Sequence, residues 1–455
     1  MKSWLREFSR LILAGIVCWS MSGRVAAAGE PVKPETPAAP PPGKVERKGP
    51  LAGLPSAPGP HIEKIKAMGD NTWLELGSPT PDPKWGDGIG RSYSYRMAYV
   101  EDMRGAFLYG DGVHGGTTMR NGKKYYNDAL FLYDINGHRW VCAYPGFEIG
   151  TYSATVTVDK DGFEATKDGP LPIAAAVHGY GNLTYDPVNK MFMSMQDESG
   201  SGHYRSSMPE RGTFREQNAA KLTGLAHASP WMFDTVEGHW TVKKTEMGSP
   251  KLAHSGHLHY VPSKQAIFWY ACEVSRGVSY YDPAKNTWRE IQVKTPRRFG
   301  SYDTISCYDT KRNRIYFPGA SKTGPDGKVT HDLMAYDVAT DAWMDLNPKG
   351  DAALTFDGGE CSNVASVQYD SANDVALIFS FGRQPSFAER SVVAYSPDKN
   401  ELTSATKKID GDLRNGQHNC FYDPELNAHF IFTAGDSTPG GKMFVYRYKR
   451  AAEKQ

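Results

Sequence analysis

The sequence lacks an excess of charge of either sign. Its 455 residues contain 52 lysines and arginines against 51 aspartates and glutamates, which gives a formal net charge of +1. A chain with this balance has no broad positive field to attract phosphate backbones or anionic lipid. The composition therefore argues against a nucleic-acid partner.

Long apolar runs are absent beyond the amino-terminal segment. Residues 1–28 begin with Lys2, Arg6 and Arg10, continue through an apolar run at 11–19 and end in three alanines. This order is typical of a secretory signal peptide, and the run is shorter than the roughly 20 residues that span a bilayer. The sequence predicts cleavage near Ala28, a secreted or periplasmic mature protein, and no transmembrane segment.

Short catalytic motifs are also missing. The sequence has no glycine-rich phosphate loop, no serine nucleophile elbow and no paired-cysteine zinc pattern. Of its six cysteines, Cys18 lies in the signal segment and five remain, so at least one is expected to stay unpaired even if a disulfide forms. Packing is their default role. We predict no cofactor and no metal site, and we assign no catalytic residue.

Proline is abundant in one stretch. Ten of the 30 prolines lie between residues 31 and 60, where periodic apolar residues are almost absent. Such a stretch cannot bury enough surface to fold alone and is typical of an extended spacer. The sequence therefore predicts a signal peptide (1–28), a proline-rich disordered linker (29–70) and a folded domain (71–450).

The remainder of the chain contains a repeat. A first strand ends in Tyr-Asp or a similar pair, a second strand is more apolar, a third ends in an aromatic residue and Asp, and a fourth carries Trp. First-strand signals lie at 183–187, 258–262, 306–309, 367–370 and 420–424, with a weaker copy at 97–99. The third-to-fourth hairpins run from Tyr133 to Trp140, Phe233 to Trp240, Tyr281 to Trp288 and Tyr336 to Trp343, and Tyr395 to Leu402 keeps the spacing without Trp. Short strands with a period of roughly 50 residues predict an all-β fold, a β-propeller of four-stranded blades.

The number of copies and the chain ends predict how the ring closes. Six copies favour six blades, while the doubled distance between Trp140 and Trp240 leaves a seventh open. The last copy has no fourth strand, and the segment around Trp73 has the pattern of one. We predict that this amino-terminal strand completes the last blade and removes the open sheet edge.

The Tyr-Asp and Trp hairpins, together with single glycines after the second strand at Gly110, Gly319, Gly382 and Gly435, resemble the kelch repeat over residues 71–448. The resemblance implies a propeller like the central domain of galactose oxidase or the six-bladed kelch proteins. It also implies two enzymatic alternatives, copper-dependent oxidation and the proton transfer of N-acetylneuraminate epimerases. No stretch matches the copper-ligand motifs residue by residue, so that activity is not carried over.

Loop length distinguishes the two rims of the predicted ring. Turns from the first to the second and from the third to the fourth strand are short and form what we call the short-turn rim. Long segments at 112–126, 146–177, 196–228, 321–330 and 384–389 fall on the opposite, long-loop rim. Long loops on a rigid scaffold commonly carry binding or catalysis.

Polar side chains gather at the starts of the innermost strands and in the loops of the long-loop rim, where we expect them to converge on the channel mouth. On a strand, His257 and His259 share one face and His254 lies on the other. The candidate ligand-binding residues are Arg91, Tyr93, His114, His178, Tyr180, Asp197, His254, His257, Tyr302, Asp303, Glu360, Asn363, Arg383 and His418.

The sequence therefore predicts an exported, monomeric kelch-like propeller that binds a glycan or a protein on its long-loop rim. A carbohydrate-active epimerase, lyase or copper-dependent oxidase stays open as the alternative. In an epimerase, Glu198, Glu273 or Glu360 would act as base while Arg91 or Arg383 held a substrate carboxylate. No spacing singles out one such pair.

Overall fold

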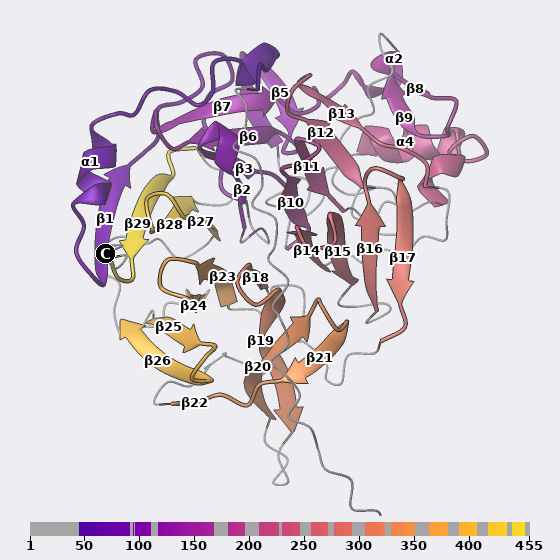
Figure 1. The fold of residues 1–455 in the computed structure, drawn as a ribbon. Coiled ribbons are helices and arrows are strands. Elements are labelled where there is room, and N and C mark those ends of the chain that lie inside the picture. Colours follow the sequence, from indigo (N-terminus) through magenta and orange to yellow (C-terminus); the bar gives the residue numbers. More distant parts are fainter. Residues whose placement is uncertain are drawn as a thin grey trace, which may run out of the picture. The chain divides into compact units, whose positions relative to one another are not determined.

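The repeats form a six-bladed β-propeller (Figure 1). The computed structural model describes residues 45–450 except 92–93, 95, 111–116, 168–180, 196–208, 227–229, 246–255, 272–276, 294–304, 324–328, 351–363, 381–390, 407–416 and 435–438. The prediction of six blades is confirmed. Five sheets have four strands each, and blade 5 has one additional short parallel strand.

The strands of each blade follow one another from the centre of the ring outward. Blade 1 contains β2 (Ala98–Val100), β3 (Gly105–Leu108), β6 (Leu130–Asp134) and β7 (Arg139–Tyr144). Blade 2 contains β10 (Leu183–Asp186), β11 (Met191–Ser194), β12 (Trp231–Asp234) and β13 (His239–Thr241). Blade 3 contains β14 (Gly256–Val261), β15 (Ala266–Ala271), β16 (Val278–Asp282) and β17 (Thr287–Ile291).

The second half of the ring repeats this order. Blade 4 contains β18 (Cys307–Asp309), β19 (Arg314–Thr323), β20 (Val329–Asp337) and β21 (Ala342–Asp345). Blade 5 contains β23 (Val364–Asp370), β24 (Val375–Ser380), β25 (Ser391–Ser396) and β26 (Glu401–Thr406), with β22 (Lys349–Gly350) beside β26. Blade 6 contains β27 (Gln417–Asp423), β28 (Ala428–Ala434), β29 (Lys442–Arg447) and β1 (Thr72–Gly77).

The ring closes as predicted, because β1 pairs with β29. Trp73 lies opposite Tyr446 in this pair, with ring centroids 4.7 Å apart. The Tyr446 hydroxyl donates to Asn71 Oδ1 at 2.7 Å, and Asn71 has a left-handed backbone with φ of 49°. In a continuous hairpin the equivalent tyrosine and asparagine are close in sequence: the Tyr281 hydroxyl donates to Asn286, five residues later. Blade 6 is therefore an ordinary hairpin blade whose last strand comes from the other end of the chain.

Cross-strand aromatic pairs hold the outer hairpins. In blades 1 to 4 the aromatic residue of the third strand lies directly opposite the Trp of the fourth, with centroids between 5.1 and 5.7 Å apart: Tyr133 and Trp140, Phe233 and Trp240, Tyr281 and Trp288, Tyr336 and Trp343. Such a pair contributes about 0.5–1.5 kcal/mol beyond its buried area. In blade 5, Leu402 takes the position of the Trp opposite Tyr395.

The repeated Tyr-Asp builds the short-turn rim. In blade 4, Asp309 Oδ1 accepts hydrogen bonds from the backbone N–H groups of Lys311 at 2.9 Å and Arg312 at 3.0 Å. The Tyr308 hydroxyl donates to Asn313 Oδ1 at 2.6 Å, and Asn313 has φ of 56°. The carboxylate thus satisfies the turn's free donors, while the tyrosine holds the left-handed residue that starts the next strand. This explains why the dipeptide recurs at many turns of this rim.

The doubled spacing between Trp140 and Trp240 is filled by an insertion on the long-loop rim. Its elements among the described residues are α2 (Tyr152–Thr155), β8 (Val156–Val158), β9 (Glu164–Thr166), α4 (Pro209–Gln217) and η3 (Thr223–Ala226). In blade 1, β4 (Thr117–Arg120) and β5 (Lys123–Tyr126) form a separate hairpin on the same rim. The buried side chains Tyr126, Phe147, Tyr152, Val156 and Phe214 form one apolar cluster that joins these pieces.

Residues 45–70, which the sequence predicts as the last part of the linker, contain η1 (Gly49–Leu51) and α1 (His61–Lys66). Ile62 and Ile65 of α1 are buried in the cluster that joins blades 1 and 6. Lys48 N donates to Val236 O at 2.8 Å, at a turn of blade 2. This part of the segment is therefore attached to the propeller. No helix of the described residues is both long and apolar enough to cross a membrane.

Candidate functional site

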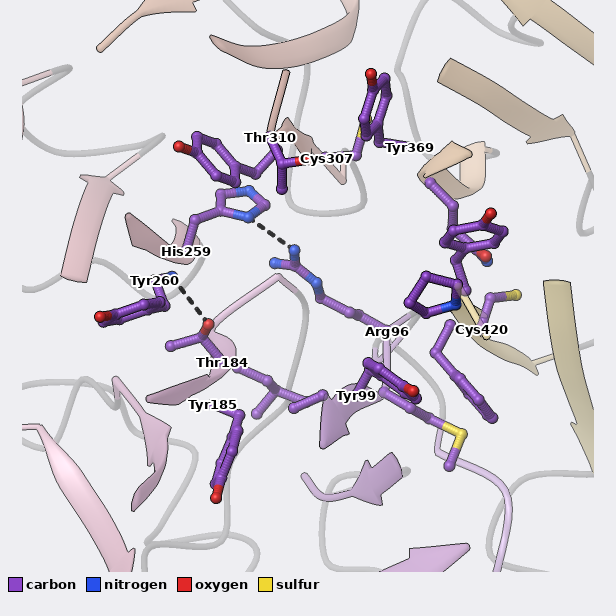
Figure 2. A pocket seen from close by; sticks show the side chains of 18 of the residues that line it. Arg96, Tyr99, Thr184, Tyr185, His259, Tyr260, Cys307, Thr310, Tyr369 and Cys420 are labelled. Carbon is purple, nitrogen blue, oxygen red and sulfur yellow. Dashed lines mark hydrogen bonds between the residues drawn. The ribbon is translucent and has the colours of Figure 1, made fainter. Parts of the chain in front are cut away.

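A cavity of about 450 Å³ lies where the six first strands end, at the short-turn rim (Figure 2). Every blade contributes the tyrosine of its repeat to the wall: Tyr99, Tyr185, Tyr260, Tyr308, Tyr369 and Tyr422. The residues of the following turns form the outer edge: Glu101, Pro187, Pro262, Thr310, Ser371 and Pro424. The volume is within the range of small-molecule sites, roughly 300–1,000 Å³.

Some of these tyrosines use their hydroxyl groups in contacts between blades. Tyr185 donates to Asp102 Oδ1 of blade 1 at 3.3 Å, and Tyr422 donates to Asp370 Oδ1 of blade 5 at 3.1 Å. Burial raises the pKa of Tyr260 and of Tyr308 to about 12. At neutral pH the tyrosines therefore keep their protons, and they offer the cavity aromatic surface rather than acid–base chemistry.

Arg96 reaches into the cavity from the strand segment preceding β2 (Figure 2). Its Nη1 donates to the Leu258 carbonyl and its Nη2 to His259 Nδ1, each at 2.8 Å. The guanidinium thus links blade 1 to blade 3 through two neutral acceptors. Burial lowers the pKa of Arg96 to about 10, so the group stays charged at neutral pH but is poorly solvated.

A chain of hydrogen bonds continues from Arg96. Since His259 Nδ1 accepts from Arg96, we assign its ring proton to Nε2, which donates to Ser306 Oγ at 2.7 Å. The Ser306 hydroxyl then donates to His257 Nδ1 at 2.8 Å. His257 Nε2, the end of this chain, has no hydrogen-bond partner among the described residues.

The imidazoles of His257 and His259, which belong to this series of hydrogen bonds, are both neutral. Burial and the charge of Arg96 lower the pKa of His257 to about 3 and that of His259 well below its ordinary value. Ser306 is fully buried, and the histidine beside it faces a cation instead of the carboxylate that would strengthen a base. The group is therefore a hydrogen-bond chain and lacks the electrostatics of a nucleophilic dyad.

The two thiols of the cavity are also unreactive. Cys307 and Cys420 line it, and both are buried and unbridged. Burial raises the pKa of each thiol well above its ordinary value, which suppresses the reactive thiolate. Among the described residues no group of three or more His, Cys, Asp or Glu side chains is arranged to hold a metal ion.

The structure describes three of the residues predicted for the long-loop rim. Arg91 is fully buried and donates to the carbonyls of Asn127 at 3.1 Å and Ala129 at 3.2 Å. His257 is fully buried on β14, and its contact with Ser306, shared with His259, confirms that these two histidines lie on one face. His418 belongs to β27, opposite Thr433. The others lie outside the described residues: Tyr93, His114, His178, Tyr180, Asp197, His254, Tyr302, Asp303, Glu360, Asn363 and Arg383.

Sequence reasoning missed the cavity at the short-turn rim and Arg96 within it. Loop length favours the opposite rim, and short repeated turns carry no sign of binding. One signal was present in the sequence: Arg96 directly precedes the apolar first-strand signal that begins at Met97. A cation next to a repeated apolar strand marks a position that packing alone does not explain.

The fold and cavity define a six-bladed β-propeller with a ligand-sized chamber in its channel. No protein-family model matches the chain. TolB from Acinetobacter baumannii is similar in structure, with 10% identity, a TM-score of 0.37, and coverage of 71% of this chain and 61% of TolB. The chain thus spans less than two thirds of the length of TolB.

Two further solved structures are similar at the same level. For the oligogalacturonate lyase of Vibrio parahaemolyticus, identity is 10%, the TM-score is 0.41, and 83% of this chain and 98% of the lyase are covered. For U3-55K, identity is 8%, the TM-score is 0.42, and 84% of this chain and 100% of the other are covered. Similarities of this size do not identify a function.

Proposed function

We propose that the protein is an exported, kelch-like β-propeller that binds a small glycan unit in the cavity of its short-turn rim. The observation that carries this proposal is that six tyrosines, one from each blade, line one cavity. Aromatic faces provide flat apolar surface for the C–H faces of a sugar ring, and polar groups at the edge hold its hydroxyls. Thr310 and Ser371 supply such hydroxyls at the edge.

Blocking the cavity tests this function. Thr310 is exposed in its turn and lines the opening, so Thr310→Trp is expected to fill the entrance without disturbing a blade. Ala284→Trp is the matched control, because Ala284 is an exposed turn residue of the same rim that does not line the cavity.

We expect glycan-array and calorimetric binding by the mature chain to fall at least tenfold in Thr310→Trp and to stay unchanged in Ala284→Trp. If the unaltered chain, Thr310→Trp and Ala284→Trp all bind the glycan equally, the glycan binds elsewhere on the molecule and the proposal is contradicted.

The long-loop rim supports a second candidate, binding of a protein or a larger glycan there. The insertion on that rim is built around the buried carboxylate of Glu164, which Arg211 contacts at 2.7 Å and Arg215 at 2.5 Å. A packed insertion of this kind can hold flanking loops in a fixed position. If the ligand binds on the long-loop rim, Tyr180→Ala and Tyr302→Ala reduce binding and Thr310→Trp leaves it intact. These variants therefore distinguish the two candidate sites.

An enzymatic role of the same rim is distinguished by turnover. If an epimerase, lyase or oxidase operates there, substitution of Glu360 or His418 abolishes turnover and retains substrate binding. A binding module loses affinity gradually instead. Export is tested independently by sequencing the amino terminus of the protein recovered outside the cytoplasm, which we expect to begin close to residue 29.

A further inference from the structure

We propose that the cavity of the short-turn rim receives an oxyanion and that the Arg96 guanidinium binds it. This inference rests on the proposed function, since it requires that the cavity hold a ligand. It adds the chemical class of that ligand: a small acidic sugar bearing a carboxylate, sulfate or phosphate group.

The first argument is the unused hydrogen-bonding capacity of Arg96. A guanidinium has five N–H donors in a planar fork. The described residues supply only two acceptors, the Leu258 carbonyl and His259 Nδ1. Arg447, in contrast, donates to four backbone carbonyls, those of Asn427, Leu426, Lys66 and Met68. Arg447 thereby uses four of its five donors within the fold, whereas Arg96 uses two with the described residues and has donors left for a ligand.

The second argument is uncompensated charge. Arg104 and Asp423 show how this ring pairs a buried guanidinium, with two parallel contacts of 2.7 Å. No carboxylate of the described residues makes such a pair with Arg96, and none contributes to its pKa. Among the described residues that line the cavity, Glu101 at the exposed edge is the only acid. The described lining therefore offers the Arg96 guanidinium no buried carboxylate partner.

The third argument is that the surroundings of Arg96 are neutral and only partly open to solvent. His259 is held neutral, and the nearby Cys307 keeps its proton. In such surroundings a lone guanidinium is costly, and an oxyanion held by two parallel hydrogen bonds offsets part of that cost. The tyrosine rings around it provide the surface against which the body of the ligand packs. A neutral sugar packs against the tyrosine rings but brings no negative charge to the Arg96 guanidinium.

A matched series of probes tests the charge directly: glucose, glucuronate, glucose 6-sulfate and glucose 6-phosphate share one ring and differ in the anion. Calorimetry on the mature chain is expected to give at least tenfold tighter binding for the anionic members than for glucose. Higher chloride concentration weakens only those members. Equal affinity for all four overturns the inference.

Substitution then assigns the effect to Arg96. Arg96→Gln is expected to lower the affinity for the anionic probes to the affinity for glucose. Arg96→Lys is expected to retain part of the preference for anionic probes, because it keeps the positive charge but loses the planar fork of donors. If Arg96→Gln binds glucuronate like the unaltered chain, the guanidinium serves only as a link between blades 1 and 3 and the inference is wrong.

Because loss of that link could unfold the ring, a measurement on the unaltered protein accompanies the variants. The Nε–Hε resonance of Arg96, followed by NMR in arginine-labelled protein, is expected to shift with glucuronate and not with sodium chloride at equal ionic strength. An unmoved resonance at saturating glucuronate overturns the inference even if no variant folds.

Thr310→Trp separates failure of this inference from failure of the proposed function. If glucose and glucuronate bind equally and both are lost in Thr310→Trp, the cavity is a sugar site without anion preference. If neither is affected by Thr310→Trp, the cavity is not the site and both proposals fall.

Discussion

At the scale of single residues, the two neutral histidines of the channel make the stability of the protein depend on pH. Burial and Arg96 lower the pKa of His257 to about 3, against 6.5 for an ordinary histidine. The unfolded chain therefore takes up the proton first, and stability present above a pH of about 6.5 is lost as the pH falls toward 3. At about pH 5 the His257 imidazole costs about 2 kcal/mol of stability.

We therefore expect the free energy of unfolding in urea to fall between about pH 7.5 and about pH 5, and His257→Asn to reduce that fall by about 2 kcal/mol. The difference between the two pH values is compared, because the substitution also has a pH-independent cost. His239→Asn is the control, since His239 is half-buried on an outer strand and remote from Arg96. An identical fall in His257→Asn and the unaltered chain contradicts the assignment.

At the scale of elements, β1 pairs with a strand, β29, from the other end of the chain. Trp73→Ala removes the stacking partner of Tyr446 and is expected to cost about 2–3 kcal/mol. It should also release the strand, so trypsin cleaves at the exposed Lys66 of α1 before global unfolding.

Trp288→Ala is the matched control for the closing strand. It removes the equivalent pair with Tyr281 from a continuous hairpin, so it lowers stability without exposing α1. Mass spectrometry of the early tryptic fragments distinguishes the two. If both variants are cleaved at Lys66 at the same rate, β1 is not the weak point of the ring.

The elements also show what the sequence can and cannot predict. The blades and their closure were predictable because their determinants are local: a left-handed residue, one intervening residue and Trp recur at Asn286 and Trp288, and again at Asn71 and Trp73. The contact of Arg96 with His259 joins residues 163 positions apart. It exists only after the ring has closed, and no spacing in the sequence indicates it.

A second difference from the prediction concerns the long-loop rim, where the length of the segments between strands suggested irregular loops. The insertion instead contains helices and strands around Glu164, whose partner Arg211 is 47 positions away. Neither residue belongs to a repeated pattern, so their pairing could not be read from periodicity. Candidate residues of that rim remain a prediction wherever they lie outside the described part of the chain.

At the scale of the whole molecule, we expect the insertion and the ring to unfold as separate cooperative units. The insertion depends on Glu164, which is almost fully buried between Arg211 and Arg215 and accepts a hydrogen bond from Tyr152 at 2.5 Å. The two guanidinium groups lower the pKa of Glu164 to about 2, so its contribution is complete above a pH of about 4.5 and is lost as the pH falls toward 2. The insertion should therefore remain folded at about pH 5, where the channel histidines already weaken the ring.

Glu164→Gln tests this separation, because it leaves two buried guanidinium groups without their carboxylate and is expected to cost the insertion about 3–5 kcal/mol. Hydrogen exchange should accelerate in α2, β9 and α4 while β14 and β27 stay protected, and glucose binding in the cavity should not change. Glu210→Gln is the comparison, since Glu210 receives hydrogen bonds in the same insertion but remains partly exposed. Loss of protection in all six blades together with the insertion is evidence for a single cooperative unit and against this division.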